Sequence, residues 1–204
     1  MSLAHITENK ISVDEYLEGE ILSEIKHEYI DGEVYAMAGA STKHNLISSN
    51  TLYELKSQLK QNNSFCDVFS SDMKVKVNSD ITTSFYYPDV MVCCENNKGD
   101  DHYQNTPVII VEVLSQSTRK NDYTTKMHHY FSIPSLQEYV LIEQDICQVQ
   151  IYKRSDDWKS KAYFPGDEIN FESINSTVSV EDIYYHVDNK DLVEFIKDKE
   201  EKEA

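Results

Sequence analysis

Seven residues near the middle of the chain, Val108 to Leu114, constrain its fold more than any other stretch. Six of them are large aliphatic residues and one is a glutamate, Glu112. An apolar run of this length without alternation predicts a β-strand that is buried on both faces. A buried carboxylate costs several kcal/mol unless a metal ion, a proton or a cation compensates its charge. We therefore predict a functional role for Glu112.

The stretches around this strand predict a mixture of helices and strands. Ser12 to Glu15 have capping-box spacing and predict a short helix to about Glu18, and Asp31-Gly32 between apolar residues predicts a hairpin turn. The other predicted elements are a helix over Lys43–Leu59, strands over Cys66–Phe69, Met73–Val77 and Phe85–Cys94, a helix over Asp122–Phe131, a hairpin of Glu138–Ile142 and Gln148–Lys153, weaker strands near Lys161–Phe164 and Glu168–Phe171, and a short helix from about Val180.

This order predicts an α/β fold, bordering on α+β, in which helices flank a mixed central sheet. Residues 12–187 are expected to form one domain. Residues 188–204 contain seven acidic residues and are expected to form an acidic tail or a terminal helix.

The sequence also bears on the compartment in which the protein works. No apolar run approaches the ~20 residues of a membrane-spanning helix. The first five residues lack the basic start and long apolar stretch of a signal peptide, so we expect a cytoplasmic protein. The four cysteines are Cys66, Cys93, Cys94 and Cys147. They show no CxxC spacing, so we expect buried, reduced thiols rather than a disulfide or a zinc site.

The charge of the chain restricts its partners. Lys and Arg number 19 and Asp and Glu number 36, so the formal net charge is −17 at pH 7. This charge opposes non-specific attraction to a polyanion such as nucleic acid. A nucleic acid partner would need a local basic patch or a cleft neutralised by a metal ion, and Arg119, Lys120 and Lys126 are the candidates for such a patch.

Two acidic residues, Asp89 and Glu112, are candidates for a shared metal site. Both lie within predicted strands, and the polar loop between them, Glu95 to Thr106, is long enough to let those strands be neighbours. Adjacent strands lie about 4.8 Å apart, so carboxylates on one face could share a divalent cation. Carboxylate oxygens, a backbone carbonyl and water suit Mg²⁺ or Mn²⁺ rather than zinc.

Lys126 is the third candidate. It lies three residues after Tyr123 and four before Tyr130, so it should flank the buried face of its helix and reach the sheet. An ammonium group beside a metal can orient or help deprotonate the attacking water, or stabilise a developing phosphorane. The alternative is that Glu112 forms a structural ion pair with Lys126 or Arg119.

The same residues resemble a known family. The resembling segments are Tyr87-Pro88-Asp89, Val111–Thr118 and Asp122–Tyr130, with Glu28–Val34 and His44 upstream and Glu138–Ile142 downstream. They resemble the Uma-two family of restriction endonuclease-like proteins, which belongs to the PD-(D/E)xK nuclease superfamily. The most specific part is the Glu-Val-Leu-Ser-x-Ser-Thr run with the downstream Asp and Lys. The resemblance spans roughly Ser12 to Tyr185.

The resemblance implies a restriction-endonuclease-like core that hydrolyses phosphodiester bonds with Mg²⁺ or Mn²⁺. Asp89 and Glu112 would be the metal ligands, together with the backbone carbonyl of Val113. One departure matters, because the superfamily pattern places a lysine two residues after the glutamate, where this chain has Leu114. The Uma-two pattern implies that this role has moved to Lys126.

Glu28 and His44 are candidates for supporting roles. Glu28 resembles the extra acid that many members of the superfamily supply from upstream, and the alternative is a simple strand-end charge. His44 falls in the first turn of a predicted helix, where capping or packing is the alternative to a role in the site.

The leading hypothesis is a Mg²⁺-dependent DNA endonuclease that acts as a homodimer, because two-fold symmetry serves the cutting of two strands. Two alternatives stay open. One is a non-catalytic interaction module that retains the nuclease fold, which the net charge of −17 favours. The other is metal-assisted hydrolysis of a different phosphate ester.

Overall fold

The structure is a computed structural model, and it describes residues 10–78, 82–95 and 101–203. The strands are β1 (His27–Ile30), β2 (Glu33–Ala36), β3 (Asp67–Ser70), β4 (Lys74–Asn78), β5 (Thr83–Tyr86), β6 (Val90–Cys93), β7 (Tyr103–Gln104), β8 (Pro107–Leu114), β9 (Glu138–Glu143), β10 (Val149–Lys153), β11 (Ser160–Tyr163), β12 (Glu168–Phe171) and β13 (Ser176–Ser179). The helices are α1 (Val13–Leu22), α2 (Thr42–Gln61), α3 (Arg119–Asn121), a π-helical turn (Asp122–Lys126), α4 (Met127–Phe131), α5 (Val180–Ile183) and α6 (Lys190–Glu203), with 3₁₀ turns at Arg154–Asp156 and Glu172–Ile174.

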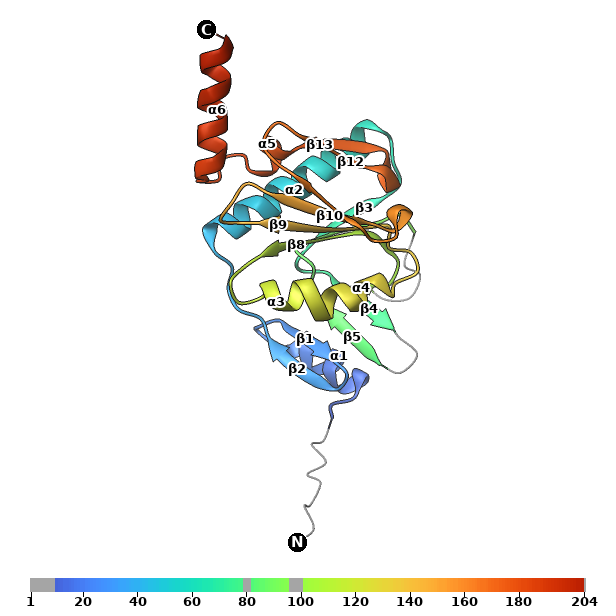
Figure 1. The fold of residues 1–204 in the computed structure, drawn as a ribbon. Helices are drawn as coiled ribbons and strands as arrows, with labels where there is room; N and C mark the ends of the chain where they lie inside the picture. Colours follow the sequence, from blue (N-terminus) through green and yellow to red (C-terminus); the bar gives the residue numbers. More distant parts are fainter. Residues whose placement is uncertain (1–9, 79–81, 96–100, 204) are drawn as a thin grey trace.

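Most strands belong to two sheets. The six-stranded sheet has the order β11-β10-β9-β8-β6-β3, and the five-stranded sheet has the order β2-β1-β5-β4-β7. The larger sheet is mixed, because β8 is parallel to β9 and antiparallel to β6. Figure 1 shows α2 and the β12–β13 pair on one side of it, and the helical segment α3–α4 between its other side and the five-stranded sheet. This arrangement is the predicted mixed sheet flanked by helices, with a second sheet added.

The predicted central strand is β8, which is buried on both faces. Val111 and Val113 pack into the apolar cluster on the side of α2, whereas Ile110 and Leu114 pack into the cluster on the side of α3–α4. Side chains alternate along a strand, so Glu112 lies on the same side as Ile110 and Leu114 and faces the helical segment.

Two local predictions are confirmed at the N-terminal end. Ser12 and Glu15 form a reciprocal capping box, in which the Ser12 N–H donates to Glu15 Oε2 at 2.8 Å and the Glu15 N–H donates to Ser12 Oγ at 3.3 Å. Asp31 and Gly32 join β1 to β2 with φ values of 48° and 91°. Two positive φ values in a two-residue loop are typical of the type I′ turn that Asp-Gly favours.

The predicted strand Phe85–Cys94 is wrong as a single element. The chain leaves the five-stranded sheet after β5 and enters the six-stranded sheet at β6, and Tyr87-Pro88-Asp89 forms the crossing. Pro88 has no N–H to donate to a ladder, which favours a break at this position. Asp89 therefore directly precedes β6 and does not lie within a strand.

The expectation of four reduced thiols is also wrong. Cys66 and Cys94 form a disulfide, while Cys93 and Cys147 are free and buried. The antiparallel pairing of β3 with β6 places Asp67 opposite Cys93, so the next residue outward on each strand, Cys66 and Cys94, also face each other. Such a pairing depends on strand register, which a search for CxxC spacing does not detect.

The C-terminal acidic segment forms the helix α6, which projects from the domain in Figure 1. Its first turns pack on the domain, because Leu192 is buried and Phe195 contacts the larger apolar cluster. Of the predicted loop Glu95–Thr106, the last part contains the short strand β7, and residues 96–100 lie outside the described residues. No helix among the described residues is long and apolar enough to cross a membrane.

Candidate active site

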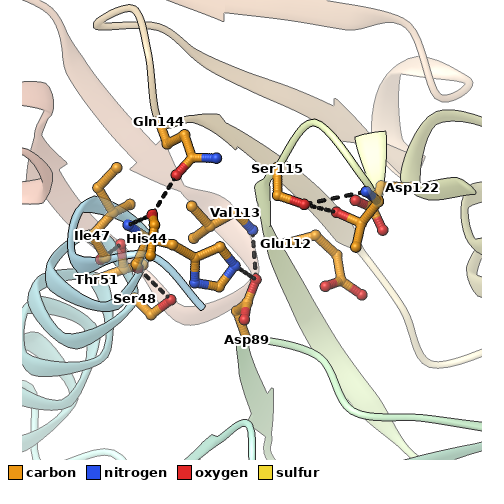
Figure 2. Close-up of polar contacts among 12 residues, drawn as sticks. His44, Ile47, Ser48, Thr51, Asp89, Glu112, Val113, Ser115, Asp122 and Gln144 are labelled. Atoms are coloured by element: carbon orange, nitrogen blue, oxygen red, sulfur yellow. Dashed lines mark hydrogen bonds and ion pairs between the residues drawn. The ribbon is translucent and has the colours of Figure 1, made fainter. Parts of the chain in front are cut away.

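The two candidate metal ligands come from neighbouring segments of the six-stranded sheet. β6 pairs with β8 so that Val90 lies opposite Val111, and Asp89 is the residue just before β6. Figure 2 shows the Asp89 carboxylate beside the Val113 N–H, next along β8 from Glu112. The charge of Asp89 contributes, after burial, to raising the pKa of Glu112, so the two carboxylates belong to one cluster. That they hold one metal ion stays a prediction.

Asp89 is fixed by two groups that come from different elements. Its Oδ2 accepts a hydrogen bond from the Val113 N–H at 2.7 Å and lies 3.3 Å from Nε2 of His44. His44 is in the first turn of α2, where the Ser41 hydroxyl caps the helix by accepting from the His44 N–H. The carbonyl of Val113, the third predicted metal ligand, belongs to the same residue that binds Asp89.

The electrostatics of His44 follow from this contact. Burial alone lowers the pKa of His44, but the hydrogen bond and the charge of Asp89 outweigh burial and raise the pKa above its ordinary value. The imidazole therefore gains positive charge next to Asp89 more readily than a free histidine would. His44 therefore contacts a candidate metal ligand, which favours a supporting role in the site over the alternative of a capping or packing residue.

Lys126 lies at the centre of the acidic residues. Its Nζ is 2.8 Å from Glu28 Oε1, 3.2 Å from Glu112 Oε1 and 3.5 Å from Asp122 Oδ1. Glu28 comes from β1 of the five-stranded sheet and Glu112 from β8 of the six-stranded sheet, so the lysine joins the two sheets through the helix between them. Both predicted residues, Lys126 and Glu28, thus lie in one cluster with Glu112.

The helix that carries Lys126 differs from its prediction in a way that matters for the site. It begins at Arg119 and contains a π-helical turn over Asp122–Lys126. The buried residues along it are Asp122, Lys126 and Tyr130, whereas Tyr123 is only partly buried. The lysine therefore lies in the middle of the buried face and not on its flank. π-helical turns of this kind occur often at functional sites.

Tyr130 is a member of the site that the sequence did not single out for a role. Its hydroxyl donates to Glu112 Oε1 at 2.8 Å, the same oxygen that accepts from Lys126 at 3.2 Å. The contacts that the described residues make with this carboxylate thus fall on one oxygen, and Oε2 is left for another ligand. The spacing of Tyr130, four residues after Lys126 on a helix, was the available signal.

Asp122 is a second residue that sequence reasoning missed. It is 1% exposed, and its Oδ1 makes no hydrogen bond with any described residue, although it lies within ion-pair distance of Lys126. Glu28 Oε1 is also buried, and its partner is the Lys126 ammonium at 2.8 Å. Buried carboxylate oxygens are costly unless positive charge compensates them, so both atoms indicate a region that is built for positive charge.

Charge is the dominant property of this cluster. Three carboxylates, those of Glu28, Glu112 and Asp122, lie within 3.5 Å of one lysine, and Asp89 adds a fourth negative charge nearby. Burial raises the pKa of Glu112 well above its ordinary value and outweighs the charge of Lys126, and burial likewise raises the pKa of Asp122. The carboxylates in turn outweigh burial at Lys126 and raise its pKa well above the usual range. Burial thus favours the neutral form of the two carboxyl groups, while the neighbouring negative charges favour the charged form of the lysine. A bound proton or cation would relieve both the burial of charge and the repulsion among the carboxylates.

The predicted nucleic-acid residues lie outside this cluster. The Arg119 guanidinium bonds to both carboxylate oxygens of Glu143 and stacks over the Tyr123 ring, with 5.6 Å between Cζ and the ring centroid. Lys120 is exposed. Arg119 is therefore largely occupied by a partner within the domain, and Lys120 is the freer cation of the two.

The cluster does not contain a metal cage of side chains alone. Among the described residues, no group of three or more His, Cys, Asp or Glu is arranged to hold a metal ion. A metal at Asp89 and Glu112 would need the Val113 carbonyl and water to complete its ligands. These are the hard oxygen ligands that Mg²⁺ accepts, and Mg²⁺ commonly keeps several waters.

Comparison with a solved structure shows the class of fold. The chain is similar to a crystal structure described as a putative nuclease belonging to DUF820 from Anabaena variabilis, with a TM-score of 0.67 and 20% sequence identity. The similarity covers 85% of this chain and 97% of that chain. The predicted restriction-endonuclease-like fold is confirmed.

Comparison of sequences then gives the family. Residues 13–179 match the model of the Uma2 family, described as "Putative restriction endonuclease", and the chain belongs to this family. Two relatives from Synechocystis sp. are uncharacterized proteins. The protein slr1290 is 33% identical over 178 residues, which cover 86% of this chain and 92% of the relative. The protein sll1609 is 36% identical over 150 residues, which cover 72% and 82%.

Proposed function

We propose that this protein is a divalent-metal-dependent endonuclease that hydrolyses phosphodiester bonds in DNA. The observation that supports the proposal best is the buried cluster in which Lys126 bonds to Glu112 of β8, with Asp89 just before the neighbouring strand β6. The family description and the description of the structural neighbour as a putative nuclease agree with this chemistry.

The metal in this proposal is Mg²⁺ or Mn²⁺, held by Asp89, Glu112 and the carbonyl of Val113. Restriction endonuclease-like families generally use divalent metals. The residues fit such an ion, because they offer oxygen donors and because the carboxylates of the cluster outnumber its one lysine. A bound divalent ion would supply Lewis-acid stabilisation of the phosphate and a more acidic water.

The residues around the ion have different roles in this proposal. Lys126 acts as a fixed positive charge that orients the attacking water and stabilises the phosphorane, because its neighbours hold its pKa well above the ordinary range. A lysine with a raised pKa is a poor general base, so we do not assign it the removal of the water's proton. Tyr130 and His44 hold Glu112 and Asp89 in place, and Glu28 and Asp122 hold Lys126.

Two measurements test this proposal. In titration calorimetry with Mg²⁺, the wild type should bind the ion, and Asp89→Asn should lose most of the heat of binding. The control Asp67→Asn changes an exposed acid on β3 and should bind the ion as the wild type does. In plasmid cleavage, Glu112→Gln and Lys126→Met should both lose activity. Equal heats from the wild type and Asp89→Asn would rule out the proposed metal site, and full cleavage by Lys126→Met would rule out the proposed role of the lysine.

A second candidate function is a non-catalytic interaction module. The net charge of −17 and the pairing of Arg119 with Glu143 favour it, because both weaken attraction to DNA. This candidate expects no cleavage of any nucleic acid with Mg²⁺ or Mn²⁺. Mn²⁺-stimulated cleavage that disappears in Glu112→Gln would exclude it.

We also propose that the protein is a homodimer and that it is located in the cytoplasm. A two-fold symmetric pair would present one site to each DNA strand. Light scattering coupled to size-exclusion chromatography would give the mass directly, and a monomer that still cuts both strands at one position would contradict the need for a pair.

A further inference from the structure

A disulfide joins two neighbouring strands at one edge of the six-stranded sheet. Cys66 directly precedes β3 and Cys94 directly follows β6. Both cysteines are partly exposed, so the bond lies near the surface of the domain. Cys93 and Cys147, in contrast, are buried, and burial raises the pKa of each of these two thiols to about 12. Buried thiols of this kind are inert, so the Cys66–Cys94 pair is the part of the cysteine chemistry that solvent can reach.

The end of β6 that carries the disulfide is poorly held by its other neighbour. On the side of β8, the register shifts between Val92 and Cys93, and Cys93 lies opposite Pro107. Pro107 has no N–H to donate to the ladder. On the other side lies β3, a strand of four residues at the edge of the sheet. The disulfide therefore fastens β6 to the edge strand at the point where pairing with β8 is weakest.

The disulfide also fixes the end of α2. The Ser64 N–H donates to the carbonyl of Leu59 at 2.9 Å, and the Cys66 N–H donates to Ser64 Oγ at 3.2 Å. The short chain between α2 and β3 is thus bonded back to the last turns of the helix. At its other end α2 carries His44, which contacts Asp89 just before β6. The disulfide and the His44–Asp89 contact therefore connect α2 to β6 at opposite ends.

We propose that Cys66 and Cys94 form a reversible thiol–disulfide site, which holds β3 and the end of β6 in place when oxidised and loosens them when reduced. In a cytoplasmic protein, a disulfide is usually transient and redox-sensing, not permanent. Exposed disulfides are also more easily reduced than buried ones. The site is independent of the proposed nuclease activity, because its chemistry needs only the two cysteines and a partner thiol or disulfide.

A low-molecular-weight disulfide, such as oxidised glutathione, is the class of oxidant that the site requires. The thiolate of one cysteine attacks this disulfide, forms a mixed disulfide and releases one glutathione thiol. The thiolate of the second cysteine then attacks the sulfur of the first, forms the Cys66–Cys94 bond and releases a second glutathione thiol. Two electrons pass from the protein to the oxidant, and the two protons of the cysteine thiols end on the two glutathione thiols. Reduction by two glutathione thiols is the reverse sequence.

The first measurement is a redox titration of the folded protein. The protein is equilibrated without denaturant in mixtures of reduced and oxidised glutathione, and free thiols are then trapped with iodoacetamide and located by peptide mass spectrometry. Cys66 and Cys94 should change together from unlabelled to labelled as the mixture becomes more reducing, and the change should reverse on reoxidation. The control Cys147→Ala removes a buried free cysteine outside the pair and should give the same transition.

The second measurement is hydrogen exchange of the oxidised and the reduced wild type. The bond links residues with a sequence separation of 28, and such a cross-link restricts mainly the opened state. Amides of β3 and of the end of β6 should therefore exchange about 10-fold faster, or more, in the reduced protein. Amides of β9, at the centre of the sheet, should exchange equally in both forms. The double variant Cys66→Ser/Cys94→Ser should exchange as the reduced wild type does in every mixture.

Two results would overturn the proposal. One is a pair that stays in a single oxidation state in every glutathione mixture while the protein is folded. The other is a pair that changes its oxidation state without any change in the exchange of β3. Neither measurement involves cleavage of nucleic acid, so either failure would leave the proposed nuclease function as it stands.

Discussion

Replacing Lys126 with methionine tests the charge balance of the whole site. The lysine residue is 5% exposed, and carboxylate oxygens of Glu28, Glu112 and Asp122 lie 2.8, 3.2 and 3.5 Å from its Nζ. Methionine keeps most of the volume of the side chain and removes the charge. Removing one partner of a buried ion pair costs about 3–5 kcal/mol, because the other charge is left uncompensated. We expect Lys126→Met to lower the free energy of unfolding by about this amount at pH 7.5.

The loss should depend on pH in a predictable direction. Burial raises the folded-state pKa values of Glu112 and Asp122. Stabilisation from a carboxyl group with a raised pKa is present below its unfolded pKa, about 4, and is lost as pH rises through the folded pKa. Lys126 lowers both pKa values, so they should rise further in its absence. The deficit of Lys126→Met should therefore be largest at pH 7.5 and should shrink toward pH 5.

Urea unfolding followed by circular dichroism at pH 7.5 and pH 5.0 measures both effects. The matched control is Lys76→Met, which removes a partly buried lysine whose Nζ lies 5.7 Å from the centroid of the Phe85 ring. Equal deficits for the two variants at both pH values would refute the reasoning, because the three carboxylates around Lys126 would then add nothing to the cost of losing the lysine. A deficit of Lys126→Met that grows toward pH 5 would refute the sign of the pKa argument.

Two further substitutions test the supports of the site. Tyr130→Phe keeps the ring and removes the hydroxyl that bonds to Glu112, so the affinity for a divalent ion, measured by calorimetry, should fall about 10-fold. The control Tyr184→Phe removes a buried hydroxyl that bonds to backbone carbonyls elsewhere and should leave the affinity unchanged. An equal loss in both variants would argue against a specific role of Tyr130. Arg154→Ala should lower the free energy of unfolding, measured by urea denaturation, by about 2–3 kcal/mol. The Arg154 guanidinium donates at 2.6 Å to each of two carbonyls just after α4. A loss below about 0.5 kcal/mol would show that water replaces the guanidinium at these carbonyls.

The sequence predicted the parts of the fold that depend on neighbouring residues. The Asp31-Gly32 turn follows from backbone preferences of two residues, and the capping box of Ser12 follows from a four-residue spacing. The burial of Val108–Leu114 follows from its composition alone. Each of these features is determined within a short segment, so a single sequence contains enough information to find it.

The features that the sequence did not predict depend on contacts between distant segments. The Cys66–Cys94 disulfide requires the register of β3 against β6, and the break at Pro88 depends on the chain's passage from one sheet to the other. The π-helical turn places Asp122 and Lys126 on the buried face of the helix, where the sequence predicted Lys126 on its flank. Tyr130 was predicted to be buried, but its bond to Glu112 depends on how the helix packs on the sheet. The pairing of β6 with β8 was predicted correctly, because two strands joined by a long loop often pair, whereas the position of Asp89 just before β6 was not.

The packing of the helical segment explains why Lys126 comes from a helix and not from the strand. Position 114, two residues after Glu112, faces the same side of β8, and Leu114 is 2% exposed there within the cluster that contains Tyr130. A lysine at that position would have its ammonium among apolar side chains under α3–α4. Lys126 approaches from above the sheet and reaches Glu112 and Glu28 together, which a strand residue of the larger sheet would not. Once a helix covers this face, the positive charge that the carboxylates need is best supplied by the helix itself.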